Sequence, residues 1–151
     1  MDSSPSILSH ACILVGRLIF AAVFAMAMSF KFLGMSETAA FIGAAGLPAP
    51  LLLAWAAAFF ELALVLCFLT GAFFSEAALA AAAYVLFLGI VFHGPAHWNA
   101  NQTEFGFFVD HFTFLAGLLF AAANGPGDWL ALKGLRLINI GVPQNSTVVS
   151  R

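Results

Sequence analysis

The stretch LLLAWAAAFFELALVLCFLTG, residues 51–71, decides the fold class of this chain. It holds one charge in twenty-one positions, that of Glu61. A helix of this length crosses about 30 Å of hydrocarbon, because each residue adds about 1.5 Å. A carboxylate in the middle of such a segment is costly in lipid, so we expect Glu61 to face the interior of a helix bundle. The segment therefore predicts a membrane-spanning helix with one buried acid.

The composition of the whole chain points to the same class. Hydrophobic residues make up 63% of the 151 residues and charged residues only 8%, whereas a soluble domain has about 25% charged residues. The mean hydropathy is +1.03. The net charge of −2 is too small to indicate a nucleic-acid partner. We therefore predict a single membrane domain over residues 1–151, surrounded by the lipid bilayer.

Apolar runs of spanning length occur four times, which predicts an all-α, integral membrane four-helix bundle. None of the runs alternates between apolar and polar residues as a barrel strand does. A short interfacial helix is predicted from Ser36 to Ala45, because glycine and prolines follow it at residues 46–50. The predicted spans are 11–33, 51–71, 77–93 and 105–124, followed by a tail at 125–151.

Basic residues outside the spans indicate the orientation. Lys133, Arg136 and Arg151 follow the fourth span, whereas the loops 34–50 and 94–104 have no Lys or Arg. The positive-inside rule therefore predicts that both termini are cytoplasmic, although Lys31 at the outer end of the first span argues weakly the other way.

The first span has a second interpretation as a signal peptide, since Ala25 and Ala27 could form a cleavage site. The segment before that site is unusually long, and Arg17 is its only Lys or Arg. We therefore expect a membrane span.

Two cations of the first span are candidate partners of Glu61. Arg17 and Lys31 are fourteen residues apart, close to four helical turns, so both project from the same face. Arg17 lies toward the cytoplasmic end and Lys31 toward the outer end. Either cation could pair with Glu61, whose level lies between them.

Further ionisable residues gather at the outer half of the last two spans. His93 ends the third span, and Asp110 with His111 comes early in the fourth, so a short antiparallel connection places the two histidines at similar depth. The polar loop between these spans suits a lid that carries His97 and Trp98. These groups, together with Lys31 and Glu61, predict one polar pocket at the outer half of the bundle.

This pocket has two interpretations. A histidine beside a carboxylate can relay protons, which a reaction at a quinone head group requires. In the alternative, the basic side chains only extend to the membrane interfaces, the acid forms a structural ion pair, and the histidines cap helix ends. On the first interpretation the predicted catalytic residues are Glu61, His93 and His111, and the predicted cofactor-binding residues are Arg17, Lys31, Trp98 and Asp110.

Other cofactors are less favoured than a quinone. His93 and His111 could ligate a b-type haem, or could bind a metal together with His97, but a single histidine pair is weak support for either. We therefore predict no metal site. Cys12 and Cys67 lack the CxxC spacing of a thiol relay.

Five segments carry a resemblance to a known family, in this order along the chain: GRLIFAAVFAMAMSFKFLG, GLPAP, FFELALVLCFLTG, VFHGPAHW and FFVDHFTFLAGLLFAAANGPGDW. Over about residues 14–132 the chain resembles the DoxX family of small four-helix bacterial membrane proteins. The resemblance implies a protein of the bacterial cytoplasmic membrane, related to the DoxD subunit of thiosulfate:quinone oxidoreductase and to membrane redox complexes.

The resemblance also implies which polar positions recur in the family, here occupied by Arg17, Lys31, Glu61 and His93. The chain departs in the fourth span, where the family often has Lys-Asn and this sequence has Asp110-His111. Two functions remain open. One is a quinone-linked redox or accessory subunit, and the other is a non-catalytic subunit that docks a larger membrane complex through Ala/Gly-rich helix faces. A small-molecule carrier has less support, because no internal repeat or broken helix is evident.

Overall fold

The computed structural model describes residues 6–99, 101–132 and 135–137. Four helices of this part are long and apolar enough to cross a membrane, namely α1, α3, α4 and α5. The prediction of an all-α, multi-pass membrane protein is confirmed. The elements in chain order are α1 (Ile7–Leu33), α2 (Met35–Ala44), α3 (Pro50–Thr70), α4 (Phe74–His93), the short 3-10 helix η1 (Pro95–His97) and α5 (Thr103–Asn124).

The helices begin somewhat earlier than the predicted spans. Helix α1 starts at Ile7 rather than at residue 11, because Ser6 caps its first turn by accepting a hydrogen bond from the Ser9 N–H at 3.2 Å. Helix α3 ends at Thr70, and the next residue, Gly71, has a φ of 73°, a left-handed conformation that suits glycine. Of the predicted tail, residues 138–151 lie outside the described part of the chain.

The short helix predicted between the first two spans is confirmed as α2. Its N-cap is Gly34, without a side-chain capping bond, so the helix begins at Met35 and the predicted start at Ser36, with Ser36 as the capping residue, is corrected. Gly46, with φ of 77°, follows its end, and Pro50 occupies the first turn of α3, where its fixed φ suits a helix start. The glycine and prolines therefore separate α2 from α3, as predicted.

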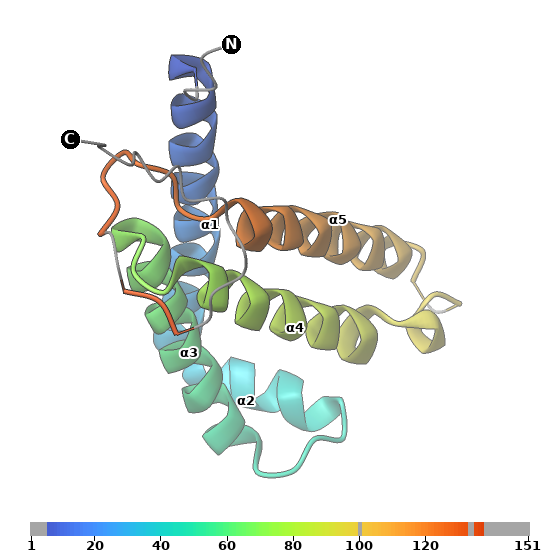
Figure 1. Cartoon of the computed structure of the whole chain (residues 1–151). Coiled ribbons are helices and arrows are strands. Elements are labelled where there is room, and N and C mark those ends of the chain that lie inside the picture. Colours follow the sequence, from blue (N-terminus) through green and yellow to red (C-terminus); the bar gives the residue numbers. More distant parts are fainter. Residues whose placement is uncertain (1–5, 100, 133–134, 138–151) are drawn as a thin grey trace, which may run out of the picture.

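The long helices form two antiparallel pairs, α1 with α3 and α4 with α5 (Figure 1). The pairs diverge from the region of the α3–α4 turn, where four aromatic rings from three helices pack together. Helix α2 lies at the end where the pairs are apart, and its Phe41 stacks on Phe92 of α4 with ring centroids 4.9 Å apart. The rings at the junction, with centroids 5.3–5.8 Å apart, belong to Phe20, Phe24, Phe68 and Phe114.

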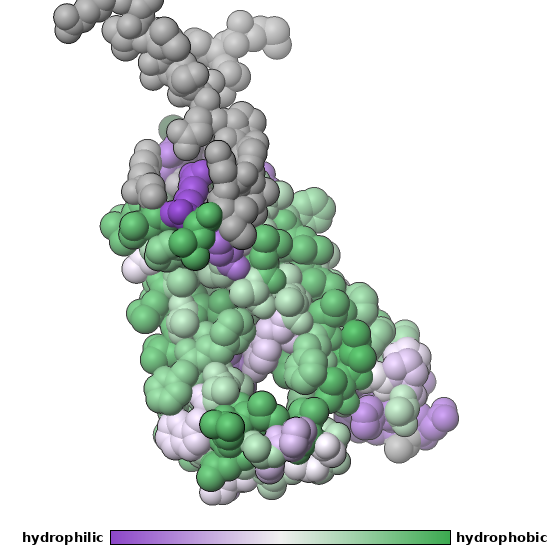
Figure 2. All heavy atoms as spheres, turned by 60° about the horizontal axis from the view of Figure 1, so that its bottom comes forward, coloured by the Kyte–Doolittle hydropathy of each residue, from purple (hydrophilic) through white to green (hydrophobic). Residues whose placement is uncertain are grey.

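The outward faces of the bundle are apolar, as Figure 2 shows over most of the face in view. Large side chains such as Leu18, Met26 and Phe120 remain 48%, 55% and 72% exposed. A soluble protein rarely exposes apolar surface of this extent, whereas lipid tails cover it without cost. The surface therefore fits a bundle embedded in a bilayer.

Candidate functional site

Glu61 is the centre of a polar cluster formed by α1, α3 and α4. Its Oε1 accepts a hydrogen bond from Nζ of Lys31 at 2.8 Å and another from the hydroxyl of Tyr84 at 2.9 Å. Glu61 is 1% exposed, whereas the side chain of Lys31 keeps 20% exposure. The structure thus places Glu61 in the bundle interior and pairs it with Lys31. We call these three residues the Glu61 cluster.

The positions of the three residues along their helices explain why they meet. Glu61 lies ten residues before Gly71 and Tyr84 lies ten residues after Phe74, so the α3–α4 turn places both at the same depth. Lys31 belongs to the last turn of α1. Helical side chains point back toward the N-terminus of their helix, which brings the ammonium group from the end of α1 toward Glu61.

The second carboxylate oxygen of Glu61, Oε2, is buried and has no hydrogen-bond partner among the described residues. An unpaired buried acceptor costs about 1–3 kcal/mol, and more when it is charged. In folded proteins such an atom marks a place where a proton, a water molecule or a ligand completes the hydrogen bonding. Oε2 of Glu61 can therefore accept a hydrogen bond from a donor that the described residues do not supply.

Tyr84 is the member of the cluster that the sequence interpretation missed. It lies in an Ala- and Leu-rich run, and nothing in that run marks it as more than a packing residue. Two signals were available. Tyr84 is the only tyrosine of the chain, and it lies as far from the α3–α4 turn as Glu61 does. A buried phenol in a membrane span needs an acceptor, and Glu61 was the acid within reach.

A second polar cluster lies at the far end of the α4–α5 pair. Nδ1 of His93 is 2.6 Å from Oε2 of Glu104, and Nδ1 of His111 is 2.7 Å from the Phe107 carbonyl oxygen. The two imidazole rings are 4.9 Å apart at their centroids, so the predicted similar depth of His93 and His111 is confirmed. The indole N–H of Trp98 donates to the His93 carbonyl at 2.9 Å. These residues form the His93 cluster.

Gly89 explains how α4 and α5 come close enough for this arrangement. A Cβ atom at Gly89 would lie 2.9 Å from Cβ of His111, so only glycine leaves room for the histidine. Because a carbonyl can only accept, Nδ1 of His111 carries the proton in that bond. The His93–Glu104 pair joins an imidazole to a carboxylate, an arrangement that can hold and pass a proton.

The other candidates at this end take no part in the two clusters. Asp110 and His97 are exposed side chains. The rings of His93 and His111 are closer than the about 6 Å that two imidazoles on opposite sides of one iron require, given metal–nitrogen bonds of about 2 Å. Within the described ranges, no group of three or more His, Cys, Asp or Glu side chains is placed to hold a metal ion.

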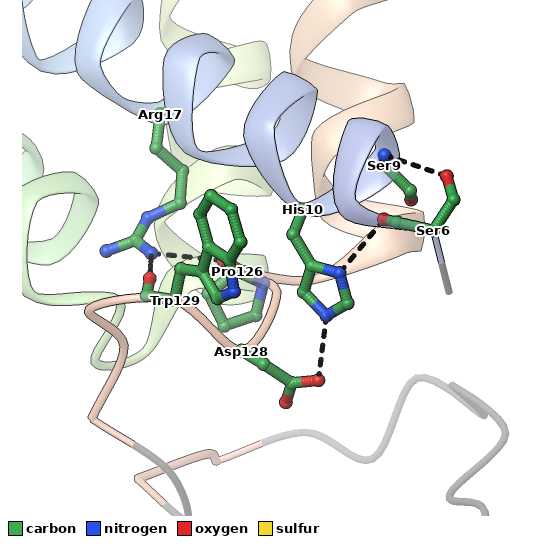
Figure 3. A network of polar contacts seen from close by, with 7 residues as sticks. All are labelled: Ser6, Ser9, His10, Arg17, Pro126, Asp128 and Trp129. Atoms are coloured by element: carbon green, nitrogen blue, oxygen red, sulfur yellow. Dashed lines mark hydrogen bonds and ion pairs between the residues drawn. The ribbon is translucent and has the colours of Figure 1, made fainter. Parts of the chain in front are cut away.

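Arg17 lies apart from both clusters and does not pair with Glu61, which corrects one of the two predicted pairings. It is 2% exposed, and all five of its N–H donors bind backbone carbonyl oxygens. Figure 3 shows the guanidinium group directed at the chain that follows α5. The acceptors, at 2.8–3.2 Å, are the carbonyls of Phe68, Leu69, Pro126, Trp129 and Leu130.

Two of these carbonyls, those of Phe68 and Leu69, belong to the last turn of α3. The last four carbonyls of a helix lack partners within the helix. Cys67 O accepts from Gly71 N, and Thr70 O accepts from Leu132 N. Arg17 binds the remaining two, and its positive charge also suits the negative end of the helix dipole. Arg17 thus completes the end of α3 and has no N–H left for a ligand.

The segment after α5 is held to α1 at a second point. Nε2 of His10 is 3.3 Å from Oδ2 of Asp128, and the His10 ring stacks on Trp129 with centroids 5.5 Å apart (Figure 3). Asp128 is largely exposed, so this contact contributes less than the buried contacts of Arg17.

The predicted single polar pocket is therefore divided in the structure. The Glu61 cluster, the His93 cluster and Arg17 occupy separate places, because the helix pairs diverge and the cations of α1 lie near opposite ends of α3. A cavity of about 230 Å³ adjoins Arg17 and does not include Glu61, His93 or His111. It is lined by Cys12, Ile13, Gly16, Arg17, Phe20, Phe74, Phe120, Ala121, Asn124 and Gly125.

A sequence model of the DoxX family matches residues 12–94, which is more than half of the chain. The chain belongs to the DoxX family. No curated protein and no solved structure matches it.

The DoxX match covers all of the Glu61 cluster, because Lys31, Glu61 and Tyr84 lie within residues 12–94. It also covers Arg17 and His93. It ends before α5, so Glu104 and His111 of the His93 cluster lie beyond the matched segment.

Proposed function

We propose that this DoxX-family protein is a quinone-linked subunit of a membrane redox complex, and that its Glu61 cluster exchanges protons with a quinone head group. The observation that carries the proposal is the buried Oε2 of Glu61, which lacks a hydrogen-bond partner beside a phenol and an ammonium group. Incompletely bonded ionisable groups inside a membrane are characteristic of functional sites such as proton-transfer sites.

The chemistry requires protons from this chain and electrons from another. Reduction of a quinone to a quinol takes up two electrons and two protons, and oxidation of the quinol releases them. The electrons would pass to or from a partner redox protein. Glu61 would hold the proton that is exchanged, and the Lys31 ammonium group would stabilise the carboxylate once that proton has left.

The His93 cluster would connect this exchange with the aqueous side. His93 lies nine residues beyond Tyr84 on α4, about 13 Å along the helix axis. Imidazole is the side chain that changes charge near neutral pH, and Glu104 can stabilise its protonated form. Trp98 and Asp110 would lie at the mouth of this path rather than at the reacting group.

The alternative is a non-catalytic accessory or assembly subunit that docks a larger membrane complex. The observation in its favour is that the outward faces of α1 and α5 are apolar and uncovered, with Ile19 and Phe120 more than half exposed. On this interpretation the Glu61 cluster only holds α1, α3 and α4 together. Under both interpretations we propose the bacterial cytoplasmic membrane as the location and cytoplasmic positions for both termini, from the family resemblance and the basic residues after α5.

The test is purification from the native membrane in mild detergent, followed by mass spectrometry of the proteins, lipids and quinones that accompany the chain. Variants Glu61→Gln, Tyr84→Phe and His93→Ala are compared with Glu37→Gln, which changes an exposed acid to an amide in the same way. We expect quinone or quinol to accompany the wild type and Glu37→Gln, and the amount of bound quinol to fall in Glu61→Gln. A large protein complex that contains no quinone bound to this chain would instead support the accessory role.

A further inference from the structure

In the Glu61 cluster both side-chain donors bind Oε1 of Glu61, and Oε2 stays free. The Tyr84 hydroxyl donates its only proton to Oε1, and Lys31 Nζ donates to the same atom at 2.8 Å. A second contact joins Lys31 Nζ to the Ala27 carbonyl at 3.5 Å. Oε2 receives nothing from the described chain. The free acceptor at the centre of the cluster is therefore Oε2 of a carboxylate whose charge Lys31 stabilises.

The two redox forms of a quinone differ in what they can offer to such an acceptor. A quinone carbonyl can only accept a hydrogen bond, so its oxygen and Oε2 of the ionised carboxylate would repel one another. A quinol hydroxyl donates, and a donor to a carboxylate makes a short, strong hydrogen bond. The remaining N–H of Lys31 suits an oxygen of either form and does not discriminate between them.

We propose that the Glu61 cluster selects the reduced form, a quinol, whose hydroxyl donates to Oε2 of Glu61. This inference rests on the proposed function and adds to it the redox form that the site recognises. A quinol in this position directs its hydroxyl proton at Oε2, the atom that can accept it. The cluster thus binds the proton-donating form of the ligand.

The Glu61 cluster is partly open at Lys31. Figure 2 shows a gap in the mostly apolar face in view, with pale purple, weakly hydrophilic residues beside it. The 20% exposure of the Lys31 side chain shows that the cluster is not sealed. Because Oε2 itself is covered, binding includes rotation of a covering side chain.

The experiment measures dissociation constants for a decyl-chain benzoquinone and for its quinol, under anaerobic conditions, with the full-length protein in lipid nanodiscs. We expect the wild type to bind the quinol about tenfold or more tightly than the quinone, the usual strength of one hydrogen bond to a charged group. Glu61→Gln should invert this preference. Its amide oxygen takes the place of Oε1, which accepts from Lys31 and Tyr84, and its NH₂ group then donates from the place of Oε2.

Glu37→Gln, which changes an exposed acid to an amide in the same way, should retain the preference for quinol. Quinone binding by Glu61→Gln guards against a fold defect in that variant. Equal affinity of the wild type for both forms, or the same preference in wild type and Glu61→Gln, would overturn the inference while leaving quinone binding intact. If neither form binds the wild type, the proposed function fails instead. The two failures are therefore distinguishable.

Discussion

Replacement of Arg17 by lysine tests whether the stability of the protein depends on the five N–H donors of the guanidinium group at the end of α3. Lysine keeps the charge but has three N–H groups, so at least two of the five carbonyls that Arg17 binds lose their donor. Each unpaired buried carbonyl costs about 1–3 kcal/mol. We therefore expect a loss of about 2–6 kcal/mol in the free energy of unfolding. Arg17→Met, which leaves all five carbonyls unpaired, should lose more.

The assay is thermal unfolding in one detergent, followed by circular dichroism. For a chain of this size about 1 kcal/mol corresponds to about 2–4 °C, so Arg17→Lys should lower the melting temperature by at least about 4 °C. The matched control makes the same changes at Arg136, which is exposed, and should leave the melting temperature unchanged. If Arg17→Lys melts with the Arg136 variants, the hydrogen bonds of Arg17 do not contribute to stability as the geometry indicates.

Two further changes follow from the packing and the topology. Gly89→Val should destabilise the protein by about 1–3 kcal/mol, because the new side chain meets His111, whereas Gly106→Ala, with open space around it, should be neutral in the same melting assay. Equal melting temperatures for the two glycine variants would contradict the close α4–α5 contact. In whole cells, a membrane-impermeant thiol reagent should label His97→Cys, whereas Arg136→Cys should react only after permeabilisation, in a background without Cys12 and Cys67. The reverse labelling would reverse the proposed orientation.

The parts of the fold that follow from local chemistry could be predicted from the sequence. Four helices follow from the length of the apolar runs, and the break after α2 follows from Gly46 and the prolines. The burial of Glu61 and its bond to a cation of the first span also follow, since an acid in lipid needs a cation and few are available. The choice of Lys31 over Arg17 comes from the structure.

The remaining features depend on tertiary geometry that the residue pattern does not contain. The partners of Arg17 are backbone carbonyls, which every residue has, so no residue type in the sequence indicates them. The division of the polar residues into separate clusters depends on the divergence of the two helix pairs, whereas the prediction placed these residues in one pocket. Tyr84 escaped notice because its neighbours are apolar.

The contacts of Arg17 also set an order for assembly in the membrane. Three of its five hydrogen bonds end on carbonyls of residues 126–130, which are synthesised after the last span. Until α5 has crossed the bilayer and residues 126–130 have reached Arg17, the first span carries a cation in hydrocarbon that lacks part of its hydrogen bonds. The first hairpin therefore reaches its final stability only when the last one arrives. A chain cut after α4 would expose this defect, so cellular quality control could recognise an unfinished molecule by a residue near its beginning.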